Sequence, residues 1–274
     1  MILFVYAYVT LYVMILARPR ISVVIPAYNE ELYIAACLDA LAAQTAMPYE
    51  VIVVDNNSND RTAAIAASYP FVRVVREPRQ GKAYAREAGF RAATGDVFAR
   101  IDADTRVRPN WTQALAASLD ANPQAAAVTG KCLFYDVPVS RIASAVHAVL
   151  YHYFQRLLAG TEVLWGSNMA VRSEAWEAVR SECSMREDID EDIDFTFLLH
   201  KHRLVVVRDC RIVADVSALR GKTTPRAIRA YLQTWPKDYE LHGMPHRAAV
   251  IRAVTAGCQV ATYIPALVLS RRSR

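Results

Sequence analysis

Four short apolar runs rich in Val and Ile alternate with longer Ala-rich segments in the N-terminal half of the chain. The runs occupy residues 21–25, 51–54, 72–75 and 97–101. Continuous apolar runs, as opposed to alternating ones, are typical of strands buried on both faces of a parallel sheet. The segments between them predict three helices: one beginning near Glu30, one ending near Ser68 and one from about Lys82 to Ala93. We therefore expect an α/β fold with a mostly parallel sheet flanked by helices.

Further elements are predicted outside this alternation. Asn29 belongs to the residue types that commonly cap a helix N-terminus, so we expect it to cap the first helix. Residues 126–131 predict a strand, and residues 141–159 predict a helix that carries many aromatic side chains. The acidic run 187–194 precedes an apolar helical pattern, and acidic side chains are favourable at a helix N-terminus.

Three polar clusters follow the first, second and fourth apolar runs. They are residues 26–30 (PAYNE), 55–58 (DNNS) and 102–104 (DAD). Ligands of open α/β sheets bind beyond the carboxyl ends of the strands, so the clusters predict one shared ligand site. Asp102 and Asp104 suit a hard divalent cation that shares its ligands with phosphate oxygens. Taken alone, the same pair also fits turn carboxylates that cap a strand end.

Net charge limits the kinds of partner that we expect, and cysteine content limits the kinds of structural site. A formal net charge of +5 favours anionic partners such as nucleotides, phosphorylated lipids or anionic membranes. Basic residues are scattered until the tail at 271–274 and no nucleic-acid-binding module is recognisable, so nucleic acid is not an expected partner. Five cysteines without a Cys-x-x-Cys pair predict reduced thiols, and neither a disulfide framework nor a zinc site. Glycine-rich dinucleotide and P-loop motifs are absent from the sequence.

Both ends of the chain are unusually apolar. Residues 1–17 carry no charge and precede Arg18 and Arg20, which predicts a membrane anchor with the following domain on the cytosolic side. Residues 253–269 form a second apolar stretch between Arg252 and the basic tail, and predict a second membrane segment. A helix or strand buried in the protein core is the alternative for each stretch.

Six motifs occur in the order and at the spacing of a known family. They are residues 24–31, residues 53–58 with Asp60 and Thr62, residues 81–83 with Ala85, Arg86 and Gly89, residues 102–104, residues 166–168 and residues 191–192. On these motifs the chain resembles the inverting family 2 glycosyltransferases, from about Ile21 to Ser217. The resemblance implies a GT-A (Rossmann-like) fold, a nucleotide-diphosphate sugar as donor, and a divalent cation, Mn²⁺ or Mg²⁺, as cofactor.

The resemblance also implies roles for individual residues. The donor-binding residues would be Pro26, Ala27, Tyr28, Glu30, Asp55, Lys82, Asp102, Gly166, Ser167 and Asn168. Within this set, Asp55 would accept a hydrogen bond from the base, and residues 166–168 would shape the sugar or acceptor side. Asp104, together with Asp102, would hold the cation on the diphosphate. Asp192 would be the catalytic base, with Glu191 beside it.

The residue types fit inverting sugar transfer. A carboxylate must take the proton of the acceptor hydroxyl as that oxygen attacks, and the leaving diphosphate needs positive charge near it. One base on the face opposite the leaving group inverts the anomeric centre and requires no second, nucleophilic carboxylate. Asp188, Asp190 and Asp194 compete with Asp192 for the role of base by position alone.

Some features of this sequence depart from the family pattern. The Gln233-Thr234-Trp235 stretch lacks the Arg and the spacing of the Gln-x-x-Arg-Trp motif, so we do not expect processive polysaccharide synthesis. His242 and His246 are candidates for a further metal ligand only by residue type. Arg220 and Lys222 either reach the diphosphate or belong to a solvated loop.

We expect four parts in the chain. Residues 1–17 would be a membrane anchor, 18–222 the glycosyltransferase domain, 223–246 an amphipathic helix, and 247–274 an apolar membrane segment with a basic tail. The amphipathic helix, begun by Thr224 and Pro225, would lie either at the membrane interface or against the catalytic domain.

The expected function is transfer of one sugar to an acceptor hydroxyl in glycan or glycolipid synthesis at the cytosolic face of a membrane. The acceptor would be a glycan or a lipid-linked molecule. Two alternatives stay open: a polyprenyl-phosphate sugar transferase, in which the acceptor is already an anion, and a non-catalytic module that binds nucleotide or glycan.

Overall fold

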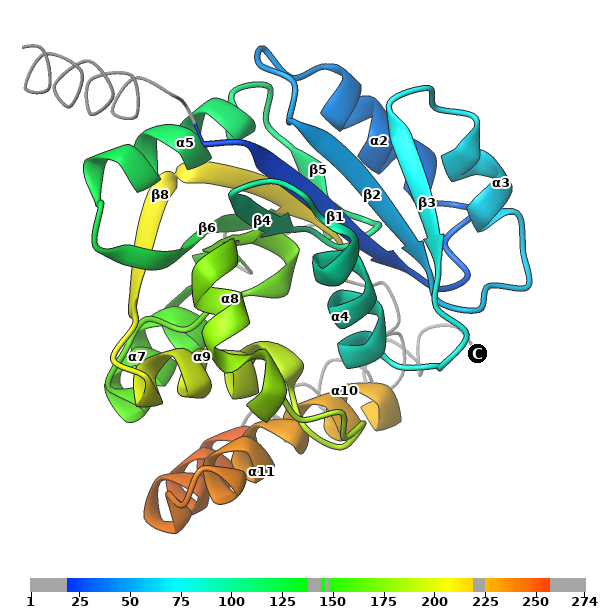
Figure 1. Ribbon diagram of the computed structural model, residues 1–274. Coiled ribbons are helices and arrows are strands. Elements are labelled where there is room, and N and C mark those ends of the chain that lie inside the picture. The colour runs from blue at the N-terminus through cyan, green and yellow to red at the C-terminus, as the bar shows by residue number, and fades with distance from the viewer. Residues whose placement is uncertain (1–18, 138–143, 146–147, 219–224, 257–274) are drawn as a thin grey trace, which may run out of the picture.

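The computed structural model describes residues 19–137, 144–145, 148–218 and 225–256 of the chain (Figure 1). Within them, one mixed sheet has the strand order β3-β2-β1-β4-β7-β6-β8-β5. The strands are β1 Ile21–Ala27, β2 Glu50–Asp55, β3 Val72–Arg76, β4 Val97–Arg100, β5 Arg106–Val107, β6 Ala125–Phe134, β7 Met169–Arg172 and β8 Val205–Val216. The strands β1 to β4, which the apolar runs predict, lie next to one another and pair in parallel.

The second half of the sheet differs from the simple alternation. β7 is antiparallel to both β4 and β6, and β5 is antiparallel to β8, whereas β6 and β8 are parallel. The pairing of β8 with β6 also contains a register shift. Arg208, Asp209 and Arg211 interrupt the apolar residues of β8, so its sequence shows no continuous apolar run. This is why the sequence pattern did not reveal it.

Helices cover both faces of the sheet (Figure 1). They are α2 Ile34–Ala42, α3 Thr62–Ala67, α4 Lys82–Ala92, α5 Trp111–Ala121, α7 Gln155–Ala159, α8 Ser173–Val179, α9 Glu191–Lys201, α10 Pro225–Leu232 and α11 Thr234–Leu241. The other helical segments are the π-helix η1 Ala148–Phe154 and the 3₁₀ helices η2 Gly166–Asn168 and η3 Arg180–Glu182. Residues 245–256 are also helical.

The two faces of the sheet carry separate apolar cores. One packs α2 and α5 against the strands, with Leu38 and Trp111 fully buried. The other packs α4, α8 and α9 against them, and Phe90, Phe98 and Trp176 meet there with ring centroids 5.5 to 5.9 Å apart. The alternation of side chains along each strand supplies both cores, as expected for an α/β sheet.

Two helices differ in part from what the sequence predicts. Asn29 does not cap α2, which begins only at Ile34; its backbone is left-handed, with φ 54°, and its Oδ1 accepts a hydrogen bond from the N–H of Asn59 at 2.9 Å. The prediction that it caps the helix is therefore wrong. Of the helix predicted at 141–159, the described part from Ala148 onward is helical, beginning as a π-helix.

The expected membrane segments are described only in part. Residues 1–17 lie outside the described residues, as do Arg220, Lys222 and residues 257–274. Among the helices that are described, none combines the length and the apolar character that a membrane span requires.

Candidate active site

The ends of β1, β2 and β4 lie side by side. Pro26 and Ala27 end β1, and Ala27 is in register with Asp55 at the end of β2. The N–H of Asn56 donates to the carbonyl of Ala27 at 2.8 Å, which extends the pairing by one residue. Asp102 follows two residues after the end of β4, the neighbour of β1 on its other side. The three polar clusters therefore meet at one edge of the sheet.

Turns hold the first two clusters in place. Oδ1 of Asp55 accepts a hydrogen bond from the N–H of Ser58 at 3.0 Å, and the N–H of Glu30 donates to Oγ1 of Thr62 at 2.6 Å. Asp55 and Glu30 are both buried, whereas Tyr28 is 46% exposed. Of these residues, Tyr28 thus presents the most surface to a ligand at this edge.

Asn56, which the sequence did not single out, ties the second cluster to α4. Its Nδ2 donates to the carbonyls of Glu77 at 3.0 Å and Arg79 at 2.6 Å, and its Oδ1 accepts from the N–H of Gly81 at 2.9 Å. Gly81 has a φ of 143°, a conformation that side-chain-bearing residues rarely adopt. The side-chain amide of Asn56 therefore helps to fix the start of α4, where Lys82 is exposed.

Arg100 is the central residue of the site, and sequence reasoning missed it. It is the last residue of β4 and is only 3% exposed. Its guanidinium forms an ion pair with Asp192 and contacts Oε1 of Glu191 at 3.0 Å and Oδ1 of Asp102 at 3.3 Å. The signal in the sequence was a charged residue inside an otherwise apolar run, two positions before Asp102.

Asp192 is held from two further directions. Its Oδ2 accepts a hydrogen bond from the N–H of Gly166 at 2.8 Å. Asp190 caps α9, because its Oδ1 accepts from the N–H groups of Asp192 at 3.1 Å and Ile193 at 3.4 Å. A Cβ on Gly166 would collide with both Arg100 and Asp192. Only glycine fits between these two side chains without displacing one of them.

The charges around Asp192 shift the pKa values of this cluster. Burial, together with the negative charges of Glu191 and Asp190, raises the pKa of Asp192 to about 7, although Arg100 acts in the opposite direction. Burial acts on Glu191 in the same direction, but Lys82 and Arg100 outweigh it and hold its pKa at about 2. The negative charge of Glu191 in turn raises the pKa of Lys82. The cluster therefore combines an ionised carboxylate with one that titrates near neutrality.

The three competitors of Asp192 have other partners. The side chain of Asp188 is 45% exposed and pairs with Arg186 at 2.8 Å and with Lys237 at 3.2 Å. Asp190 is the helix cap described above. Asp194 is buried, and its Oδ1 lies 2.9 Å from Nε2 of His242 while its Oδ2 accepts from the N–H of Ser184 at 2.9 Å. His242 is thereby engaged with Asp194, and His246 is exposed on the helix at 245–256.

Asp102 and Asp104 follow the end of β4 by two and four residues. The hydroxyl of Ser167 donates to Oδ2 of Asp102, whose side chain is 31% exposed. Asp104 is 7% exposed, and its carbonyl accepts from the hydroxyl of Tyr135 at 3.1 Å. Arg100 and Ser167 therefore link Asp102 to the segment that also holds Asp192.

Asn168 has a more internal position than the resemblance implies. It is fully buried; its Nδ2 donates to the carbonyls of Lys131 and Ile212, each at 3.1 Å, and its Oδ1 accepts from Nε1 of Trp111 at 2.8 Å. Its amide thus joins β6, β8 and α5, and it shapes the site through the backbone of η2.

Asp102 and Asp104 fit a divalent cation as a sparse ligand set. Their oxygens are the hard donors that Mg²⁺ and Mn²⁺ prefer. No group of three or more potential His, Cys, Asp or Glu ligands occurs among the described residues. A cation held by one or two carboxylates takes its remaining ligands from substrate phosphates and water. The donor set therefore fits a cation that arrives with a diphosphate.

Comparisons with known proteins agree with the fold. The PcManGT mannosyltransferase of Pyrobaculum calidifontis, solved with GDP-Man and Mn²⁺, superposes with a TM-score of 0.60 at 22% identity over 93% of this chain and 81% of its own. The glucosyl-3-phosphoglycerate synthase of Mycobacterium tuberculosis, solved with UDP, gives 0.58 at 22% identity, covering 85% and 83%. At this identity the likeness establishes the fold, and the predicted GT-A fold is confirmed.

Sequence relatives and a family model identify the family. The uncharacterized glycosyltransferase YibD of Escherichia coli (strain K12) is 27% identical over 77% of this chain, and the match covers 61% of its own length. An uncharacterized glycosyltransferase of Mycobacterium bovis is 41% identical over 42% of this chain and half of its own length. The chain thus spans less than two thirds of these relatives. The model of glycosyl transferase family 2 matches residues 22–179, more than half of the chain. The chain therefore belongs to glycosyl transferase family 2.

Proposed function

We propose that the chain transfers one sugar from a nucleoside diphosphate to an acceptor hydroxyl with inversion, assisted by a divalent cation. The observation that carries this proposal is the Arg100 cluster: a buried Asp192 with a pKa near neutrality, joined through one guanidinium to Asp102 at the strand-end edge. Two structural neighbours contain GDP-Man with Mn²⁺, or UDP, which supports a nucleotide-sugar donor.

In this proposal the donor lies along the ends of β1, β2 and β4. Tyr28, with Pro26, Ala27 and Glu30, lines the base and ribose, and Asp55 accepts a hydrogen bond from the base. Lys82, which is exposed next to the acidic cluster, adds positive charge near the diphosphate. Gly166 and Ser167 line the sugar side.

Asp192 serves as the base in this reaction. Its carboxylate takes the proton of the acceptor hydroxyl while that oxygen forms a bond to the anomeric carbon of the sugar. The bond between this carbon and the diphosphate oxygen breaks at the same time, and its electron pair leaves with the nucleoside diphosphate. A pKa near 7 suits a general base that works at neutral pH, since ideal catalytic pKa values lie close to the operating pH. Arg100 and the N–H of Gly166 orient the carboxylate.

Asp102 and Asp104 would hold the divalent cation, Mn²⁺ or Mg²⁺. The cation, when bound, supplies positive charge for the leaving diphosphate. The contact between Asp102 and Ser167 then fixes the carboxylate orientation at the sugar side.

We further propose that the reaction takes place at the cytosolic face of a membrane, in glycan or glycolipid synthesis. Support comes from the uncharged stretch at 1–17, the arginines that follow it, and the net positive charge of the chain.

The test is a panel of UDP- and GDP-linked sugars with Mn²⁺ or Mg²⁺, assayed for release of nucleoside diphosphate with membrane extract as acceptor. We expect release from one donor, a loss of about 10² to 10⁴-fold in kcat for Asp192→Asn because the general base is removed, and a loss for Asp104→Ala. Asp188→Asn is the matched control, since this exposed carboxylate lies in the same acidic run but pairs with Arg186.

Other results would favour the alternatives. Turnover that depends on Asp104 but survives Asp192→Asn would support a polyprenyl-phosphate acceptor, which is already an anion and needs no base. Nucleotide binding without release from any donor would support a non-catalytic module.

A further inference from the structure

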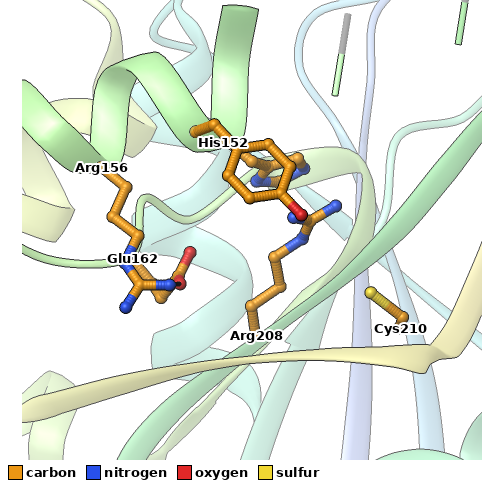
Figure 2. A pocket seen from close by; sticks show the side chains of 6 residues that line it. His152, Arg156, Glu162, Arg208 and Cys210 are labelled. Atoms are coloured by element: carbon orange, nitrogen blue, oxygen red, sulfur yellow. Dashed lines mark ion pairs between the residues drawn. The ribbon is translucent and has the colours of Figure 1, made fainter. Parts of the chain in front are cut away.

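A half-open cavity lies between β8 and the helical segment of η1 and α7 (Figure 2). Its volume is about 170 Å³. Its lining residues are His152, Tyr153, Arg156, Glu162, Arg208 and Cys210. None of the residues expected to bind the donor lines it. Pockets for drug-sized ligands begin at about 300 Å³, so this cavity fits one small group and is too small for a nucleotide sugar.

The lining of the cavity carries net positive charge. Figure 2 shows Arg208 rising from its strand toward His152, with Arg156 and Glu162 on one side and Cys210 on the other. Nε of Arg208 is buried and has no hydrogen-bond partner among the described residues. Arg156 pairs with Glu162 at 2.6 Å, which leaves the charge of Arg208 in excess. Burial, and then Arg208, lowers the pKa of His152 to about 3, so this ring is neutral.

The strand register relates this cavity to Asp192. Arg100 pairs with Met169, Met169 with Thr129, and Thr129 with Arg208. Paired residues of neighbouring strands project to the same face, so Arg208 and Arg100 share one face of the sheet. Three strand spacings separate them, or about 14 Å.

Trp165 contacts Thr129, which belongs to the row of paired residues that joins the two arginines. The backbone N–H of Trp165 donates to Oγ1 of Thr129, the residue paired with Arg208, at 3.3 Å. The centroid of the Trp165 ring system is 6.1 Å from that of the His152 ring. The next residue, Gly166, donates to Asp192. Residues 165–166 therefore contact both a lining residue of the cavity and the proposed base.

An exposed apolar stripe adjoins the cavity. Val149 is 56% exposed, Tyr153 63% and Leu157 78%. Residues four positions apart share one face of a helix, so the three side chains form a continuous row. Tyr153 belongs to both the row and the cavity lining, and the guanidinium of Arg208 lies 5.6 Å from its ring. An apolar row beside a cationic pocket matches the two parts of a phosphorylated lipid.

We propose that this cavity binds a phosphate of a lipid-linked acceptor whose apolar chain lies along Val149, Tyr153 and Leu157. Guanidinium groups suit phosphate oxygens, which accept several hydrogen bonds at once. Because the cavity is well separated from Asp192, the bound phosphate is not the attacking group. The attacking hydroxyl belongs to a glycan of more than one sugar that is attached to this phosphate, since a single sugar ring is shorter than the distance from the cavity to Asp192. This inference rests on the proposed function, which supplies the reaction at Asp192.

The test is isothermal titration of the full chain with hexyl phosphate, inorganic phosphate and hexanol. We expect hexyl phosphate to bind most tightly, since it has both the anion and the apolar chain. Arg208→Gln should weaken hexyl phosphate binding about tenfold or more, the effect of losing a hydrogen bond to a charged group. Leu157→Ser should weaken hexyl phosphate by about threefold through lost apolar contact and leave inorganic phosphate unchanged. Arg91→Gln is the control for the loss of one positive charge, because Arg91 pairs with Glu87 and does not line the cavity.

Nucleotide binding by the same samples reports that each variant is folded. Equal binding of hexyl phosphate by wild type and Arg208→Gln would overturn the phosphate site. Equal binding of hexyl phosphate and inorganic phosphate would overturn the lipid part. A failure of this site leaves donor turnover intact, whereas a failure of the proposed function leaves Arg208-dependent phosphate binding without turnover of any donor.

Discussion

At the scale of single residues, Arg100 gives the site its electrostatic character. One buried guanidinium faces three carboxylates, those of Asp102, Glu191 and Asp192. Taking such charges out of water is costly unless each has a partner. Arg100 is therefore the counter-charge that allows an ionisable Asp192 to lie in the protein interior. After burial and Arg100, the negative charge of Glu191 has the next largest effect on the pKa of Asp192, which it raises.

We predict that Glu191→Gln moves the activity of the chain to lower pH. A general base works when it is deprotonated, so activity should rise with pH through the pKa of Asp192, about 7. Glu191 raises that pKa through its negative charge. Without this charge, the guanidinium of Arg100 would no longer be shared with Glu191 and would stabilise the Asp192 carboxylate more strongly. Both effects lower the pKa. The measurement is kcat/KM against pH; an acid limb that stays in place, or moves upward, would contradict the assignment of Asp192.

Gly166→Ala should damage the site more than the fold. The added Cβ would meet Arg100 and Asp192, and forcing a methyl group into a packed site costs about 1 to 3 kcal/mol. We expect a loss of at least tenfold in kcat, because the shifted carboxylate no longer meets the acceptor. Gly243→Ala is the control: its φ of 72° makes alanine strained there, but no atom lies within 4 Å of the new Cβ. Equal losses of activity in both variants would refute a local effect.

At the scale of elements, the N-terminus of α9 is fixed by a helix that is distant in sequence. The N–H of Asp190 donates to Oδ2 of Asp238 at 3.0 Å, and Asp238 belongs to α11. Asp190 in turn caps α9, which carries Glu191 and Asp192. Burial, and then the charge of Asp190, raises the pKa of Asp238 to about 10. A neutral carboxyl group of α11 therefore supports the helix that presents the proposed base.

Because Asp238 is neutral in the folded chain, we predict that the stability of the fold depends on pH through this residue. Its carboxyl binds a proton in the folded chain between its ordinary pKa of 3.8 and about 10, but not in the unfolded chain. The stability that it contributes is therefore present below 3.8 and is lost as pH rises toward 10. Asn needs no proton, so Asp238→Asn should gain stability over wild type as pH rises from 4 to 9. Thermal unfolding over this range measures the difference.

Asp188→Asn is the control variant, because the pKa of Asp188 is shifted downward and that of Asp238 upward. Hydrogen bonds from Arg186 and Lys237 outweigh partial desolvation and lower the pKa of Asp188 below its ordinary range. Its contribution to stability is thus complete above that range, so the difference between Asp188→Asn and wild type should stay constant from pH 5 to 9. A constant difference for Asp238→Asn as well would mean that Asp238 is ionised in the fold.

At the scale of the whole molecule, local patterns revealed the half of the sheet that is built from continuous apolar strands. The ends of β1, β2 and β4, and with them the polar clusters, followed from the chain alone. β8 did not, because its polar residues at 208–211 interrupt the pattern and its place beside β6 depends on pairing between distant segments. Arg100 was missed for the same reason, and Asn56, although it belongs to the 55–58 cluster, was given no role of its own. Their functions come from contacts with residues 191–192 and 77–81, which no local pattern encodes.

The shared guanidinium of Arg100 also constrains how this chain can change over generations. Loss of Arg100 alone would leave buried carboxylates without a counter-charge. Loss of one carboxylate would change the net charge of the buried cluster and remove one partner of the guanidinium. Breaking one partner of a buried ion pair typically costs about 3 to 5 kcal/mol, a large share of the 5 to 15 kcal/mol that holds most proteins folded. Single substitutions at these positions therefore cost stability in addition to their effect on the chemistry. A descendant that abandoned this chemistry would have to exchange several of these residues together, or first acquire spare stability elsewhere.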